Sequence, residues 1–120
     1  MTLSPIPGLN KWLQSSSVAA VKNAPLAAQA AHYLLSAKRN DKLPLDPVAR
    51  FHLGNEAAVH AVHEGADLSA NGMQQSGGAM VNYFYDLTQI TTNHEKFVVE
   101  KIVTTSAEVH ALSAQITTTN

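Results

Sequence analysis

The fold of this chain is decided by the stretch DPVARFHLGN, which occupies residues 46–55. Its opening Asp-Pro pair combines a good helix N-cap with a proline suited to the first helical position. Its closing Gly-Asn pair is typical of a helix end. The stretch therefore predicts a short helix from Val48 to Leu53, with His52 in the last turn.

His52 is the first candidate for chemistry. A histidine changes charge near neutral pH because its reference pKa is about 6.5. The negative end of the helix dipole favours the protonated ring, which is the form that a general acid requires. The alternative is a structural histidine with satisfied hydrogen bonds, which is the commoner fate of a single histidine.

A second stretch, LSPIPG at residues 3–8, holds a serine between rigid neighbours. Each proline lacks an amide proton and pushes the residue before it toward extended backbone. The Ser4 hydroxyl is therefore held in one direction, with little conformational entropy left to lose. The alternative is a serine that only flanks a turn.

A third stretch, QSGGAMVNYFYD at residues 75–86, predicts a glycine break followed by a buried strand over residues 79–85. Alternation along a strand puts Tyr83 and Tyr85 on one face and Asn82 on the other. A buried tyrosine hydroxyl needs a polar partner, and a bound carboxylate or thioester oxygen could supply it. The alternative is a core strand whose tyrosines only pack.

These three stretches, in this order, resemble the serine, histidine and tyrosine segments of malonyl-CoA decarboxylase. The resemblance covers nearly the whole chain and is strongest at residues 2–13, 30–55 and 67–95. It implies an α+β fold: the C-terminal part of an acetyltransferase-like (GNAT-like) catalytic domain, mainly helices with a few strands. Residues 1–120 would form one partial catalytic domain.

The resemblance also implies an activity, the decarboxylation of malonyl-CoA to acetyl-CoA and carbon dioxide without a metal or organic cofactor. By carry-over, Ser4 holds and polarises the malonyl group, His52 donates the proton, and Tyr85 positions the substrate. The second-rank candidates for the same pocket are Asn55, Ser76 and Asn82.

The chain departs from the family pattern in three places. The helical region between Trp12 and Ala24 is shorter. Residues 56–64 read EAAVHAVHE, where the family has a glycine and then larger residues; their alanines favour helix, while the family segment suggests a strand. The family segments that precede Thr2 are not represented, including the glycine-rich loop that cradles the coenzyme A pyrophosphate, so we expect little coenzyme A affinity.

Two interpretations therefore remain open. The chain is the catalytic C-terminal piece of such an enzyme, acting within a fuller chain, beside a separate N-terminal half, or as a homo-oligomer. Alternatively, it is a truncated, inactive relic that serves only as a packing or interaction module.

Composition narrows the partners and the compartment. A formal net charge of −1 gives no general attraction to nucleic acid or to an anionic membrane, and no run of about 18 apolar residues could span one. There are no cysteines, and His60 and His63 lack a third ligand, so we expect no metal site. We expect a cytoplasmic protein, or one of the mitochondrial matrix if the source is eukaryotic.

The remaining sequence predicts further helices from caps and apolar spacing. They cover 11–14, 24–37 capped by Asn23, 69–75 capped by Ser69, and 106–116 with Ala107, Val109, Leu112 and Ile116 facing inward. Residues 39–45 read as a polar loop, residues 93–99 as a weak mixed segment, and the last four residues as a fraying tail.

Overall fold

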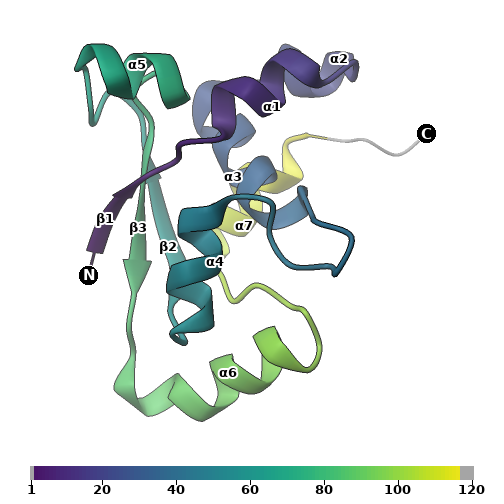
Figure 1. The fold of residues 1–120 in the computed structure, drawn as a ribbon, viewed down its shortest axis with the longest axis vertical. Coiled ribbons are helices and arrows are strands. Elements are labelled where there is room, and N and C mark those ends of the chain that lie inside the picture. The colour runs from purple at the N-terminus through teal and green to yellow at the C-terminus, as the bar shows by residue number, and fades with distance from the viewer. Residues whose placement is uncertain (1, 117–120) are drawn as a thin grey trace.

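The computed structural model describes residues 2–116. Its centre is a three-stranded antiparallel sheet in the order β1-β3-β2, built from β1 (Thr2–Pro5), β2 (Ala58–His63) and β3 (Met80–Phe84). Helices α1, α3, α4 and α7 lie to one side of this sheet, while α5 and α6 lie at its two ends (Figure 1). The predicted α+β class, with mainly helices and a few strands, is confirmed.

The helical elements follow one another in the connections between the strands and after the last of them. They are α1 (Leu9–Ser15), α2 (Ala19–Lys22), α3 (Leu26–Ser36), α4 (Pro47–Gly54), α5 (Ala70–Ser76), the short 3-10 helix η1 (Leu87–Gln89), α6 (Ile90–Val98) and α7 (Ala107–Ala114).

The main core lies between the sheet and the helices. Val59, Val81 and Tyr83 contribute the inward face of the sheet, and Tyr33 and Leu34 contribute the facing side of α3. All five are almost completely buried. On the other face of the sheet, apolar side chains such as Leu3 and Phe84 are exposed.

The predicted helix over 24–37 is present as α3, but its predicted cap is wrong. Asn23 ends α2, a short helix that the sequence analysis did not anticipate, and α3 begins after Pro25 without a side-chain cap. Pro25 is extended, with φ −58° and ψ 151°, and occupies the cap position before α3.

Within the ambiguous segment 56–64, residues 58–63 form the strand β2. The strand alternative is therefore confirmed, and the helix that the alanines favoured is wrong. Glu56 has a φ of 68°, which ends the preceding helical turn. Beyond it, β2 pairs with β3, and a register shift between Val59 and Ala61 marks a bulge. Tertiary pairing with a buried strand outweighs the helix propensity of alanine, which is the highest of any residue but amounts to less than about 1 kcal/mol per residue.

Four other predicted elements are present with adjusted ends. Strand β3 stops at Phe84, one residue before Tyr85, and the segment described as mixed forms the regular helix α6. Ser69 and Ser106 cap α5 and α7 as expected. In α7, Val109 is buried but Ala107 is exposed, so its predicted inward position is wrong. The tail at 117–120 lies outside the described residues.

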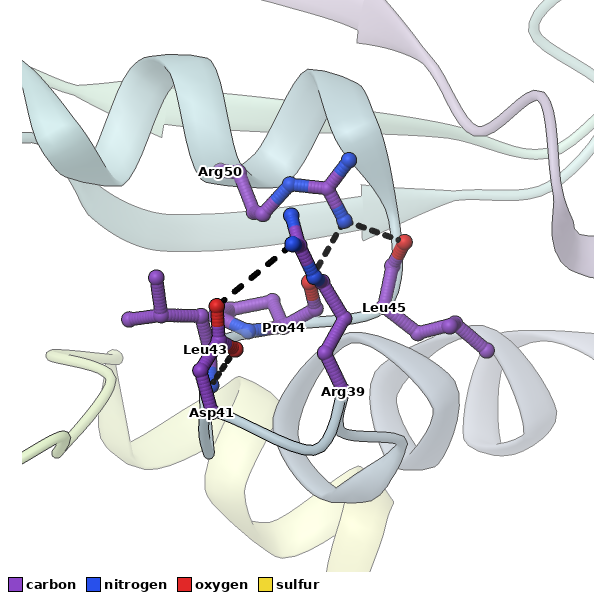
Figure 2. A network of polar contacts seen from close by, with 6 residues as sticks. All are labelled: Arg39, Asp41, Leu43, Pro44, Leu45 and Arg50. Atoms are coloured by element: carbon purple, nitrogen blue, oxygen red, sulfur yellow. Dashed lines mark hydrogen bonds and ion pairs between the residues drawn. The ribbon is translucent and has the colours of Figure 1, made fainter.

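The loop before α4 is fastened to that helix. The Arg50 guanidinium donates to the carbonyl oxygens of Pro44 at 3.0 Å and Leu45 at 2.8 Å, and Arg39 pairs with Asp41 nearby at 3.5 Å (Figure 2). Because Leu45 immediately precedes the helix cap, these bonds fix the path by which the chain enters α4.

Gly8 is expected to tolerate no larger side chain. A Cβ atom at this position would lie 2.4 Å from the Tyr33 hydroxyl oxygen, whereas one at Gly54 would meet no atom within 4 Å. We expect Gly8→Ala to lower the free energy of unfolding by about 1–3 kcal/mol through overpacking. Gly54→Ala, a matched helical control, should stay equal or gain up to about 1 kcal/mol. Urea denaturation of the two variants measures both effects, and equal stabilities would contradict the predicted close contact.

Candidate active site

Helix α4 is anchored by a buried carboxylate at its first turn. Asp46 is completely buried, and its oxygens accept hydrogen bonds from the Ala49 amide at 3.0 Å and the Tyr33 hydroxyl at 3.2 Å. Burial raises the pKa of Asp46, although these donors act in the opposite direction. Burial and the neighbouring Asp46 charge also raise the pKa of Tyr33. This predicted cap therefore ties α4 to α3 as well as beginning the helix.

At the other end of α4, His52 lies between two hydroxyl groups. Its Nε2 atom is 2.9 Å from the Ser4 hydroxyl oxygen, and its Nδ1 atom is 2.5 Å from the Tyr85 hydroxyl oxygen. The imidazole also stacks on the Tyr83 ring, with centroids 4.3 Å apart and planes inclined by 21°. Ser4 comes from β1 and Tyr85 from just beyond β3, so three distant segments converge on one ring.

The environment of His52 favours its neutral form. The ring is in the last turn of α4, as predicted, but burial lowers the pKa of His52. This direction is opposite to the one expected from the helix end, and its cause is the removal of the imidazolium from water. At neutral pH the ring is an uncharged donor and acceptor.

A neutral imidazole can satisfy both neighbours in two ways, because each ring nitrogen is either a donor or an acceptor. If Nδ1 carries the proton, the Ser4 hydroxyl donates to Nε2. If Nε2 carries the proton, Tyr85 donates to Nδ1 and Nε2 donates to Ser4, which leaves the serine hydrogen free for another acceptor. The second arrangement makes a chain of donors from Tyr85 through His52 to Ser4.

Tyr85 is suited to be the donor at the outer end of this chain. It is 36% exposed, whereas Ser4 and His52 are 4% and 8% exposed. Burial and the nearby Glu56 carboxylate raise the pKa of Tyr85, so the phenol keeps its proton at neutral pH. Tyr85 therefore joins the buried Ser4–His52 pair to the solvent side of the site.

Tyr83 lies on the same side of the sheet as Tyr85, as predicted. It belongs to β3 itself, whereas Tyr85 follows the end of that strand. Its ring supports the imidazole, and its hydroxyl is buried without a hydrogen-bond partner among the described residues. Burial, followed by the nearby Asp46 charge, raises its pKa. Tyr83 therefore supplies a flat, uncharged surface under His52.

The three second-rank candidates do not join this cluster. Asn82 faces the other side of the sheet, where its amide is 2.8 Å from the Nε2 atom of His63. The buried Ser76 hydroxyl donates to carbonyl oxygens of its own segment, at Gly72 and Ala79. Asn55 lies one turn beyond His52 but is exposed and donates to the Phe51 carbonyl oxygen.

Two surface hollows of about 440 Å³ each lie elsewhere and share Leu45. The first is lined by Gly8, Lys11, Trp12, Ser15, Tyr33, Leu45 and Pro47, and the second by Lys38, Arg39, Asn40, Asp41 and Leu45. Neither of these hollows is lined by Ser4, His52 or Tyr85.

Among residues 2–116, no three of the histidine, aspartate and glutamate side chains gather closely enough to hold a metal ion. None of the helices in the same range has the length and apolar character needed to cross a membrane.

The sequence predicted the three residues that meet at His52, namely Ser4, His52 and Tyr85, but not all of the contacts that support them. The Asp46–Tyr33 bond and the stacking of Tyr83 under His52 depend on how α3, α4 and β3 pack. Only the Asp-Pro start of α4 was visible as a signal. The contact of Glu56 with His94, at 3.1 Å between Oε1 and Nδ1, had no signal in the sequence.

Comparison with known proteins now places this arrangement in a family. The family model described as the malonyl-CoA decarboxylase C-terminal domain matches residues 10–120. The chain belongs to the malonyl-CoA decarboxylase family, as the sequence resemblance predicted.

Individual relatives agree with this assignment. The chain is 34% identical over 105 residues to the mitochondrial malonyl-CoA decarboxylase of Rattus norvegicus and 31% identical over 114 residues to that of Anser anser anser. These matches cover 88% and 95% of this chain but 21% and 22% of the relatives. The chain thus spans about a fifth of the length of these curated relatives.

Solved structures show the same fold. The crystal structure of malonyl-CoA decarboxylase from Agrobacterium vitis matches with a TM-score of 0.82 at 32% identity, and that from Rhodopseudomonas palustris with 0.81 at 36%. Each match covers 92% of this chain and 34% of the solved chain.

The lowered pKa of His52 predicts a pH-dependent term in stability. A histidine whose folded-state pKa lies below its reference value of 6.5 contributes stability that is complete above pH 6.5 and is lost as the pH falls through the folded-state value. We expect His52→Gln to remove this acid-side loss. Urea denaturation at successive pH values from 8 to 5 measures it, and an unchanged slope in the variant would contradict the burial effect.

Proposed function

We propose that this chain carries the reacting groups for decarboxylation of malonyl-CoA to acetyl-CoA and carbon dioxide. The observation that carries the proposal is the contact of His52 with both Ser4 and Tyr85, made by residues of the three stretches that resemble the family. Family membership supports it. The compartment we propose is the cytoplasm, or the mitochondrial matrix in a eukaryote.

The reaction breaks the bond between the malonyl α-carbon and its carboxylate. Carbon dioxide leaves, and the electron pair of that bond becomes the enolate of the thioester, with negative charge on its oxygen. Donors aimed at this oxygen lower the barrier because the charge develops only in the transition state. The α-carbon must then take one proton to give the acetyl group.

The Tyr85–His52–Ser4 chain can supply both needs. With Nε2 protonated, His52 donates to the Ser4 oxygen and leaves the serine hydrogen to polarise the malonyl or enolate oxygen. The α-carbon then takes the Ser4 hydrogen, Nε2 gives its proton to the Ser4 oxygen, and the Tyr85 hydroxyl gives its proton to Nδ1. A solvent proton restores the exposed Tyr85 phenol, so no positive charge builds up on the buried imidazole. Ser4 is then the contact to substrate, His52 the proton donor behind it, and Tyr85 the group that fixes the imidazole. Asn55, Ser76 and Asn82 stay second-rank candidates for substrate contact.

Partners follow from the same proposal. The substrate is a coenzyme A thioester, and no metal or organic cofactor is needed for the steps described. A separate N-terminal half of the family fold, or a second copy of the chain, would supply the coenzyme A contacts that the family resemblance leaves outside this sequence. The acetyltransferase-like architecture of such an assembly is part of this proposal.

Activity is the direct test. Ser4→Ala and His52→Asn should each reduce the formation of acetyl-CoA by about 10²- to 10⁴-fold, the usual contribution of a positioned acid–base group. Matched controls are Ser15→Ala and His110→Asn, which remove an exposed serine and an exposed histidine. Mass spectrometry of the acyl-CoA pool measures turnover by the chain alone and with an N-terminal half from a relative. Equal activity of His52→Asn and the parent chain would refute the proposal.

The interaction-module alternative makes an opposite prediction. If the folded chain neither binds malonyl-CoA in calorimetry nor gains turnover on addition of the N-terminal half, the contacts of His52 with Ser4 and Tyr85 serve packing alone. The partial length of the match, about a fifth of the curated relatives, is the observation that keeps this alternative under test.

Tyr85→Phe separates the tyrosine hydroxyl from the tyrosine ring. The variant keeps the edge-on contact with His52, whose ring centroids are 5.9 Å apart, and removes only the bond to Nδ1. We expect turnover to fall by about 10- to 100-fold as the imidazole loses its fixed orientation. Steady-state kinetics should show the loss in kcat and not in KM, and a change confined to KM would assign Tyr85 to substrate binding alone.

A further inference from the structure

The segment that holds Tyr85 has few attachments to the rest of the molecule. Tyr85 follows the end of β3, and the chain continues through η1 into α6. Within α6, only Asn93 and Phe97 are buried. Something other than sheet pairing must therefore keep the Tyr85 hydroxyl on His52.

Glu56 supplies a second connection between the same two segments. Its Oε1 atom is 3.1 Å from Nδ1 of His94, and its backbone carbonyl oxygen accepts a bond from the Asn93 side chain at 3.2 Å. Both partners are on α6. The end of α4 and the chain after β3, which meet at His52 and Tyr85, therefore meet a second time at Glu56 and α6, one helical turn further along.

The position of Glu56 is fixed relative to His52. The Glu56 amide donates to the Leu53 carbonyl oxygen, and the next amide, that of Ala57, donates to the carbonyl oxygen of His52, each at 3.1 Å. Glu56 itself adopts a φ of 68°, in the left-handed region that glycine tolerates best. Glu56 therefore places a side chain at a position where it costs conformational energy.

The link from α6 back to Tyr85 is short and locally ordered. Asp86, directly after Tyr85, accepts bonds from the Thr88 amide at 2.9 Å and the Thr88 hydroxyl at 2.7 Å. This turn begins η1, which runs into α6 without a gap. A displacement of α6 would therefore carry the Tyr85 backbone with it.

We propose that Glu56 is a positioning residue: by holding His94 on α6, its carboxylate keeps the Tyr85 hydroxyl against Nδ1 of His52. The consequence for turnover rests on the proposed function, because Tyr85 sets the tautomer that leaves the Ser4 hydrogen free. The positioning itself is a property of the folded chain without substrate.

The test uses the full chain labelled with ¹⁵N in histidine and ¹³C in tyrosine. In the parent chain, we expect a nuclear Overhauser contact between the Tyr85 and His52 rings and imidazole ¹⁵N shifts that report protonated Nε2 and unprotonated Nδ1. Glu56→Ala and His94→Ala should each lose the contact and the distinct tautomer. Glu56→Gln should retain both, because an amide oxygen can accept the same bond from His94.

Two further variants separate positioning from stability and from charge. Glu56→Gly relieves the left-handed strain, so it should be more stable to urea than Glu56→Ala while still losing the Tyr85–His52 contact. Glu95→Ala removes an exposed carboxylate from the neighbouring position on α6, where its side chain makes no hydrogen bond or ion pair among the described residues. It should behave as the parent chain.

Turnover is measured with the chain together with an N-terminal half from a relative. We expect kcat to fall about 10- to 100-fold in Glu56→Ala and to recover in Glu56→Gln. An unchanged ring contact and tautomer in both Glu56→Ala and His94→Ala would overturn the positioning role. Absence of turnover in the parent chain together with loss of the contact in Glu56→Ala would refute the proposed function while supporting the positioning role.

Discussion

The structure depends first on the buried carboxylate of Asp46. An unpaired charge in the interior is costly, so Asp46 is tolerated only with donors around it. Those donors come from the first turn of α4 and from Tyr33 on α3. Gly8 is required at the same point, because its missing side chain leaves room for the Tyr33 hydroxyl. One charged group thus fixes the approach of three segments, and with them the direction in which α4 carries His52.

His52 then brings a side chain of α4 into contact with groups from the paired strands β1 and β3 and from the chain beyond β3. Strand β1 presents Ser4, β3 presents the Tyr83 ring, and the chain beyond β3 presents Tyr85. The site needs little charge of its own: burial keeps the imidazole neutral and the phenols protonated. Such a neutral network is suited to moving a proton and stabilising an enolate without an uncompensated buried ion.

Much of this arrangement could be predicted from the sequence where local chemistry decides. Asp46 and Pro47 begin a helix by capping and by a fixed φ, and the prolines around Ser4 require extended backbone. Ser4, His52 and Tyr85 were identified by family resemblance, and the structure brings their side chains together. Prediction from local propensity failed where strand pairing determines the structure. The alanine-rich residues 58–63 form a strand because β3 is available as a partner. Prediction also failed for the charge state of His52, because the sequence gives the helix end but not the burial.

The sheet order also has a consequence for how the molecule folds. Strand β1 pairs positions 2–5 with positions 80–83, and β2 pairs with the other edge of the same strand. Closing such long loops costs chain entropy before any contact compensates it, and folds dominated by distant contacts form slowly. During synthesis on a ribosome, β1 would remain unpaired until β3 had emerged. The serine and the histidine therefore acquire their final geometry late in synthesis, and a chain interrupted before β3 would carry both residues without the arrangement that relates them.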